Sequence, residues 1–186
     1  MVAVSSLWLP VLLSAVLIFV VSSIIHMVTP WHKGDYNRLQ EEDGVMAVLR
    51  PFGLKPGDYM VPQPSSMAEM GTPAFAEKVK QGPRFVMTVF PGSSMSMTSN
   101  LVGWFVYLLA VAAMVAFIDV IAQPPGAHHH DVFHVTLIAS FLGYAAALWQ
   151  MVIWYSRSIG TTLRSTIDGV IYALITASVF SYFWPT

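Results

Sequence analysis

Long runs of apolar residues alternate with polar connections along this chain of 186 residues. Four runs hold about 18 or more residues with almost no charge, which is the length that a helix needs to cross a bilayer. The predicted membrane-spanning segments are residues 7–28, 101–122, 132–155 and 167–184. None of them shows the polar stripe of a helix in a soluble bundle. The pattern predicts an all-α membrane protein, a single integral domain over residues 1–186 with four transmembrane helices.

A polar connection of about 70 residues, positions 30–100, separates the first two segments. So few apolar residues form only a marginal core, and we expect this insertion to pack against the bundle. Within it, "TPAFAEKVKQG" predicts a helix with Thr72 as N-cap, Pro73 in the first turn and Gly82 at the end. A short helix is predicted within residues 35–50.

Two further stretches of the insertion have strand-like or extended character. "RFVMTVF" is an apolar run typical of a strand or of an interfacial segment. "LKPGDYMVPQP" contains too many prolines for a central strand and predicts an extended passage with turns.

Charge is sparse, and its placement predicts the orientation. Only 10% of the residues are charged, against roughly a quarter in soluble domains. All nine Lys and Arg lie in residues 30–100 or 156–166. The positive-inside rule places both connections in the cytoplasm, and the N and C termini and the 123–131 loop outside. The first segment lacks the basic leader of a signal peptide and is expected to remain as a helix.

Composition also excludes several functions. The net charge of −1 argues against nucleic acid as a partner, because phosphate binding needs a basic face. The absence of cysteine excludes disulfides, thiolate metal sites and cysteine nucleophiles. No phosphate-binding loop and no catalytic motif is present. The chain is therefore not expected to be an enzyme.

Small residues recur at every fourth position in the last two segments. The sets are Ala139, Gly143 and Ala147 in the third segment, and Gly169, Ala173, Ala177 and Ser181 in the fourth. Such faces allow close approach of helices in lipid. We expect the two sets to face each other, with contact between protomers of a homo-oligomer as the alternative.

The stretch "GAHHHDVFH" holds four of the six histidines. One interpretation is structural: Asp131 caps the third helix, and His134 lies in its first turn. The alternative is a divalent metal site on the outer rim, which would use His128, His130, Asp131, His134 and Asp119. Imidazole with carboxylate suits Zn²⁺ or Cu²⁺.

Two acids and two further histidines lie near the helix ends. Asp119 and Asp168 are expected within about a turn of an interface, with Asp168 paired to Arg164 at i, i+4 spacing. His26 and His32 in "HMVTPWHKGDY" are expected to form hydrogen bonds at the headgroup boundary. A ligand or proton-transfer role is the alternative for these histidines.

The stretch from "HMVTPWHKGDYNRLQEEDGVMAVLRPFGLKPGDYMVPQPSSMAEM" through "GPRFVMTVFP" to "DGVIYALITA" resembles an uncharacterised group of small bacterial four-helix inner-membrane proteins. The resemblance implies the bacterial inner membrane and transfers no activity. The leading hypothesis is a non-enzymatic membrane component that self-associates or joins a larger complex with other membrane subunits. Metal binding or transport at the outer His/Asp rim, and a channel for ions or small solutes, are the alternatives.

Overall fold

The computed structural model describes residues 2–92 and 96–186. The chain forms two compact units. The first combines Met1–Asn37 with Ser96–Thr186, and the second is Arg38–Met95. The first unit contains the four long helices, and each unit is described separately below.

Four helical spans of the first unit are long and apolar enough to cross a membrane, as the pattern of the sequence predicts. Their bounds are Val4–Val28, Met97–Ala122, His129–Tyr155 and Ile159–Tyr182. The first span joins η1 (Val4–Leu7), α1 (Trp8–Ser23) and a π-helical turn, η2 (Ile24–Val28); the second is α5 (Met97–Ala122); the third joins α6 (His129–Tyr144), η4 (Ala146–Leu148) and α7 (Trp149–Tyr155); the fourth is α8 (Ile159–Tyr182).

The fourth span starts earlier than predicted, at Ile159 instead of residue 167. Ser158 caps it by accepting a hydrogen bond from the Thr161 amide. The hydroxyls of Ser165 and Thr166 bond back to carbonyls four residues earlier in the helix. These local bonds satisfy the polar side chains, so a stretch without an apolar run still continues the helix.

The third span also differs from the predicted single helix over residues 132–155. It starts at His129, because the His128 side chain accepts a hydrogen bond from the His130 amide and occupies the N-cap position predicted for Asp131. Helix α6 then stops at Ala145, whose φ of −135° is not helical. The exposed Gln150 lies beyond this break in α7.

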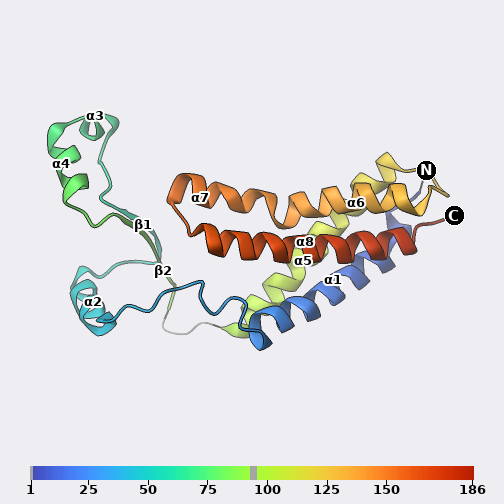
Figure 1. Cartoon of the computed structure of the whole chain (residues 1–186), viewed down its shortest axis with the longest axis horizontal. Helices are drawn as coiled ribbons and strands as arrows, with labels where there is room; N and C mark the ends of the chain where they lie inside the picture. Colours follow the sequence, from blue (N-terminus) through green and yellow to red (C-terminus); the bar gives the residue numbers. More distant parts are fainter. Residues whose placement is uncertain (1, 93–95) are drawn as a thin grey trace. The chain divides into compact units, whose positions relative to one another are not determined.

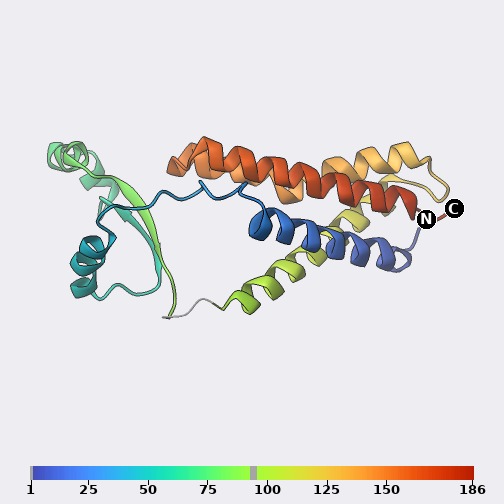
Figure 2. The same ribbon diagram turned by 60° about the horizontal axis from the view of Figure 1, so that its bottom comes forward.

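The helices pack in a ring in which α1 contacts α5 and α8, and α6 contacts α5 and α8 (Figures 1 and 2). A Cβ atom on Gly169 would lie 2.5 Å from that of Ala145, so the glycine allows close approach at the break. Ala173 and Ala177 are fully buried. These residues of α8 pack within the chain. The predicted pairing of the two sets is wrong at Gly169, which meets Ala145, and at Gly143 of α6, which faces Val111 of α5.

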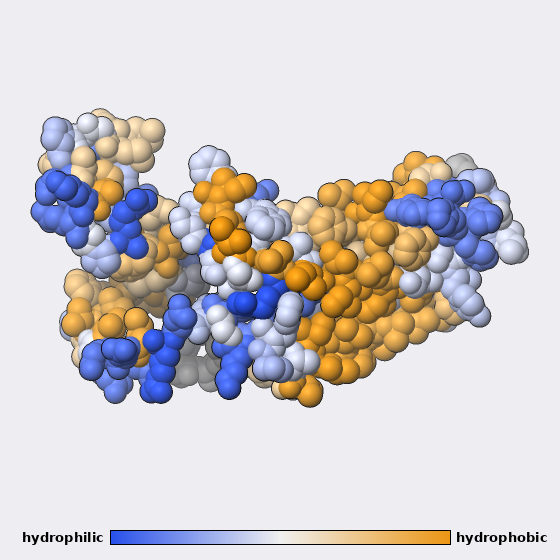
Figure 3. Space-filling model, in the orientation of Figure 1, coloured by the Kyte–Doolittle hydropathy of each residue, from blue (hydrophilic) through white to orange (hydrophobic). Residues whose placement is uncertain are grey.

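Both chain termini lie at the same end of the bundle (Figure 1), which we call the termini end. The 123–128 connection is tied to the C-terminus there, because Gly126 N donates to Pro185 O and Trp184 Nε1 donates to Pro124 O. Apolar side chains dominate the flank of the bundle in Figure 3. Large exposed hydrophobic residues such as Phe117 and Ile138 fit a surface that faces lipid.

The second unit is built around a two-stranded antiparallel sheet of β1 (Gly57–Val61) and β2 (Phe85–Val89). Helix α4 (Pro73–Gln81) begins as predicted, with the Thr72 hydroxyl accepting from the Phe75 amide. Its remaining helices are α2 (Glu42–Leu49), the single turn η3 (Arg50–Phe52) and α3 (Met67–Met70). This two-stranded sheet departs from the predicted all-α fold. The β1 stretch forms a strand despite the prolines on either side of it, because both strands of a two-stranded sheet are edge strands, and edge strands tolerate nearby prolines.

Candidate metal site at one end of the bundle

The candidate site lies at the opposite end of the bundle from the termini, where α1 ends and α8 is in its third turn. After η2 the chain turns at Pro30 and brings His32 beside Asp168 of α8. His32 Nε2 lies 2.7 Å from Asp168 Oδ2, and His32 Nδ1 lies 2.6 Å from Asp35 Oδ2. The imidazole of His32 thus lies between two carboxylates.

These carboxylates have further partners. Arg164 forms an ion pair with Asp35, and its Nε donates to Asp35 Oδ1 over 2.8 Å. Burial favours a higher pKa for the Asp35 carboxyl, but the hydrogen bonds from His32 and Arg164 outweigh it and hold that pKa below its ordinary value of 3.8. Trp31 Nε1 donates to Asp168 Oδ1 over 3.1 Å. Asp35 therefore carries its charge, and both oxygens of Asp168 are engaged.

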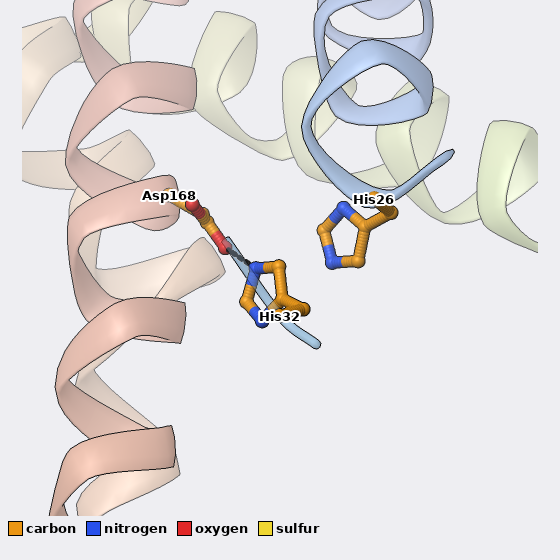
Figure 4. A group of neighbouring side chains, drawn as sticks. All are labelled: His26, His32 and Asp168. Atoms are coloured by element: carbon orange, nitrogen blue, oxygen red, sulfur yellow. Dashed lines mark hydrogen bonds and ion pairs between the residues drawn. The ribbon is translucent and has the colours of Figure 1, made fainter. Parts of the chain in front are cut away.

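His26 is the third member of the group. Its ring stacks on that of His32, with centroids 4.3 Å apart and planes 11° from parallel (Figure 4). His26 Nδ1 lies 2.9 Å from the Ser22 carbonyl oxygen, which can only accept, so Nδ1 carries the hydrogen. The Nε2 atom of neutral His26 then keeps a free lone pair.

One ligand atom each from His26, His32 and Asp168 lies within 4.8 Å of the other two. Among the described residues this is the one group of three or more His, Asp or Glu side chains that meets that geometry. Asp168 is buried, His32 is partly buried and His26 is exposed. The group is therefore reached by solvent from the His26 side.

A pocket of about 590 Å³ adjoins the group. Its walls come from the end of the first span and from α8, and Asp168 belongs to both the pocket and the group. The lining residues are mainly apolar: Ile25, Thr29, Pro30, Trp31, Arg164, Ile167, Asp168 and Ile171.

The residues predicted for the outer metal site have different surroundings. His130 and His134 lie side by side, with ring centroids 4.1 Å apart, and both are exposed. His128 and Asp131 are exposed as well, with His128 acting as the helix cap. Asp119 is fully buried in α5 and accepts a hydrogen bond from Thr136. Metal binding at this end stays a prediction.

The predicted pairing of Asp168 with Arg164 is wrong, although both residues lie in the site. Asp168 bonds to His32 and Trp31, and Arg164 bonds to Asp35. The i, i+4 rule considers only neighbours on one helix. The partners that Asp168 and Arg164 have in the structure lie 129 to 137 positions earlier in the chain. One signal was present in the sequence: the density of polar groups in "PWHKGDY" directly after an apolar helix.

Comparison with known proteins yields no match to a family model, to a curated protein or to a solved structure.

Proposed function

We propose that this chain is an integral membrane protein that binds a divalent transition-metal ion through His26, His32 and Asp168. The convergence of these three ligands within 4.8 Å carries the proposal. Two imidazoles and one carboxylate form a set that binds Zn²⁺ or Fe²⁺ in proteins and leaves a coordination position open. The neighbouring pocket shares Asp168 with the group.

The hydrogen bonds around the ligands support this function. Metal-binding histidines usually donate their second ring nitrogen to a carboxylate or a backbone carbonyl. His32 has Asp35 in that position, and His26 has the Ser22 carbonyl. Trp31 holds the oxygen of Asp168 that does not face His32. Each of the three ligands is thus oriented by a partner that would remain in place with a metal bound.

The proposed binding requires a small local adjustment. A tetrahedral zinc ion would hold its ligand atoms about 3.3 Å apart. His32 Nε2 and Asp168 Oδ2, now 2.7 Å apart, would separate and release the proton of their hydrogen bond to solvent, and His26 would move closer to both. His26 is exposed and lies in a π-helical turn, an irregularity that is common at functional sites. Turning its imidazole inward brings Nε2 toward the other two ligands.

The first experiment measures the metal content of the untagged protein, purified without chelator and then equilibrated with Zn²⁺ and desalted. We expect close to one equivalent of Zn²⁺ per chain. His26→Ala removes a ligand and should lower the affinity by more than the roughly tenfold to hundredfold lost with a ligand's hydrogen-bond partner. Its only other losses are the bond to Ser22 and the stacking on His32. The chain without bound zinc, or full affinity in His26→Ala, would contradict the proposal.

The matched control is the double variant His130→Ala, His134→Ala at the other end of the bundle. It removes two imidazoles from exposed positions, one more than His26→Ala, and we expect it to leave zinc binding unchanged. Loss of zinc in the control alone would instead identify the outer rim as the binding site.

The distribution of positive charge supports a cytoplasmic location for the proposed metal site. Lys33 and Arg164 lie next to or within the site, and the residues of the 123–128 connection include no Lys or Arg. The positive-inside rule then orients the termini end outward, across a bacterial inner membrane. In this orientation the protein would present its metal site to the cytoplasm.

A further inference from the structure

Several buried polar side chains in the membrane-spanning unit lie outside the metal site. Asp119 of α5 is fully buried, and its Oδ2 accepts a hydrogen bond of 2.7 Å from the Thr136 hydroxyl of α6. Its other oxygen, Oδ1, has no hydrogen-bond partner among residues 2–92 and 96–186. Acidic side chains inside a bundle of membrane helices are costly and commonly mark ion or proton pathways.

Buried hydroxyls continue from Asp119 along α6. Thr136, Ser140 and Tyr144 follow at intervals of four residues, so they lie on one face of the helix in successive turns. Thr136 and Ser140 are fully buried, and Tyr144 nearly so. The hydroxyls of Ser140 and Tyr144 have no hydrogen-bond partner within the described part of the chain.

The row of hydroxyls then crosses to α8. The ring of Tyr144 meets the ring of Tyr172 edge to face, with centroids 5.9 Å apart. Tyr172 is 4% exposed, and its hydroxyl likewise has no partner among the described residues. Ile171, its neighbour in the chain, lines the pocket at the end of the bundle opposite the termini.

Five buried hydroxyls in this unit have no hydrogen-bond partner among the described residues: those of Ser140, Tyr144 and Tyr172 lie in this row, and those of Ser14 and Thr162 lie outside it. Serine and threonine side chains in membrane helices normally bond back to a carbonyl of their own helix, as Ser22, Ser23 and Thr176 do here. Ser140 does not. Successive hydroxyls on α6 are one helical turn apart, and the oxygens of Ser140, Tyr144 and Tyr172 are closed to water in this packing. A bridging water between them therefore requires the helices to separate slightly.

We propose that Asp119, Thr136, Ser140, Tyr144 and Tyr172 form a proton-transfer pathway through the bundle, from the termini end to the pocket beside α8. Asp119 is the group that gains and releases the proton. Each hydroxyl or bridging water accepts one proton on an oxygen lone pair and releases its own to the next oxygen, so that charge and atoms balance at every step. The pathway does not depend on metal binding.

A purely structural role is the competing explanation, in which the hydroxyls only fill space between α5, α6 and α8. The two explanations differ for substitutions that keep the shape. Tyr144→Phe and Asp119→Asn preserve side-chain volume but remove a relay oxygen or the exchangeable proton. Packing alone predicts unchanged proton permeability in both variants.

The test uses the full chain reconstituted in lipid vesicles that contain a pH-sensitive dye, with a potassium gradient and valinomycin to drive proton entry. We expect the wild-type protein to raise the proton flux above that of protein-free vesicles. Asp119→Asn and Tyr144→Phe should each lower this flux about tenfold or more. Tyr182→Phe, at a residue that is 76% exposed, and Asp131→Asn are the matched controls and should leave it unchanged.

Folding of every variant is checked by circular dichroism and by elution as the same species as the wild-type protein. Should Asp119→Asn fail to fold, Tyr144→Phe and Ser140→Ala test the pathway without changing its charge. The proposal is overturned by a wild-type flux equal to that of empty vesicles, by wild-type flux in Tyr144→Phe, or by equal passage of sodium ions. Zinc binding measured on the same preparations separates failure of the pathway from failure of the metal site.

Discussion

His32 connects positions that are far apart in the chain. Through its two ring nitrogens it joins Asp35, three residues away, to Asp168, which is 136 positions away. Arg164 also binds Asp35, so the segment after α1 is tied to α8 at two points. The sequence predicted hydrogen bonding for His32 but not the identity of its partners, because side-chain contacts across such separations depend on how the helices pack.

A second polar contact is local and allows a prediction at this scale. Glu69 in α3 accepts hydrogen bonds from the hydroxyl and the backbone amide of Ser65. These bonds, with that from the hydroxyl contributing most, lower the pKa of Glu69 below its ordinary value of 4.5. The folded state therefore gains stability from Glu69 above pH 4.5 and loses it as the pH falls through the lower pKa of the folded state.

Ser65→Ala should raise the pKa of Glu69 toward 4.5 without reaching it, because the amide of residue 65 still donates. The measurement is a titration of the Glu69 carboxyl carbon by NMR in detergent micelles. Ser65→Thr keeps the hydroxyl and should retain the low pKa. An identical pKa in wild type and Ser65→Ala would show that the hydroxyl bond has no effect.

At the scale of elements, the third membrane-spanning segment is the main departure from the predicted fold. Its apolar run is continuous, yet α6 ends at Tyr144, and the next residue, Ala145, lies beside Gly169 of α8. Apolar composition specifies that a segment can cross the bilayer but not where its helix bends. The break in the helix coincides with the close contact between Ala145 and Gly169 of α8. The sequence of the third segment alone does not reveal a contact with another helix.

Gly169→Ala should destabilise the bundle, because the new Cβ would lie 2.5 Å from that of Ala145. Such overpacking costs about 1–3 kcal/mol, more than the roughly 1 kcal/mol that alanine gains over glycine in a helix. Thermal unfolding in detergent measures the change in melting temperature.

Gly103→Ala is the matched control, since a Cβ at Gly103 of α5 meets nothing within 4 Å. We expect it to leave the melting temperature unchanged or to raise it. A variant Gly169→Ala as stable as the wild type would mean that α6 and α8 do not pack this closely.

At the scale of the whole molecule, the proposed orientation in the membrane rests on the distribution of charge. Lys and Arg occupy the 30–100 and 156–166 connections, and the 123–131 loop has none. Four spans place both termini on one side, in agreement with their position at the same end of the bundle (Figure 1). The chain contains no cysteine, so single cysteines can report the side of each connection.

Pro125→Cys should react with a membrane-impermeant maleimide in spheroplasts, whereas Lys55→Cys and Arg157→Cys should react only after the membrane is permeabilised. All three positions are exposed, so the membrane alone should decide their reactivity. Labelling of Lys55→Cys and Arg157→Cys in intact spheroplasts, with Pro125→Cys protected, would reverse the orientation.

The sequence by itself determined the four helices that are long and apolar enough to span a membrane, the cap of α4 and the separation of charge between the connections. Each depends on composition or on contacts within a few residues. The tertiary structure alone decided which polar groups meet. It brought His26 and His32 to Asp168, and it placed Tyr144 of α6 against Tyr172 of α8. These pairs lie on different helices, and only the packing of the bundle brings them within reach of one another.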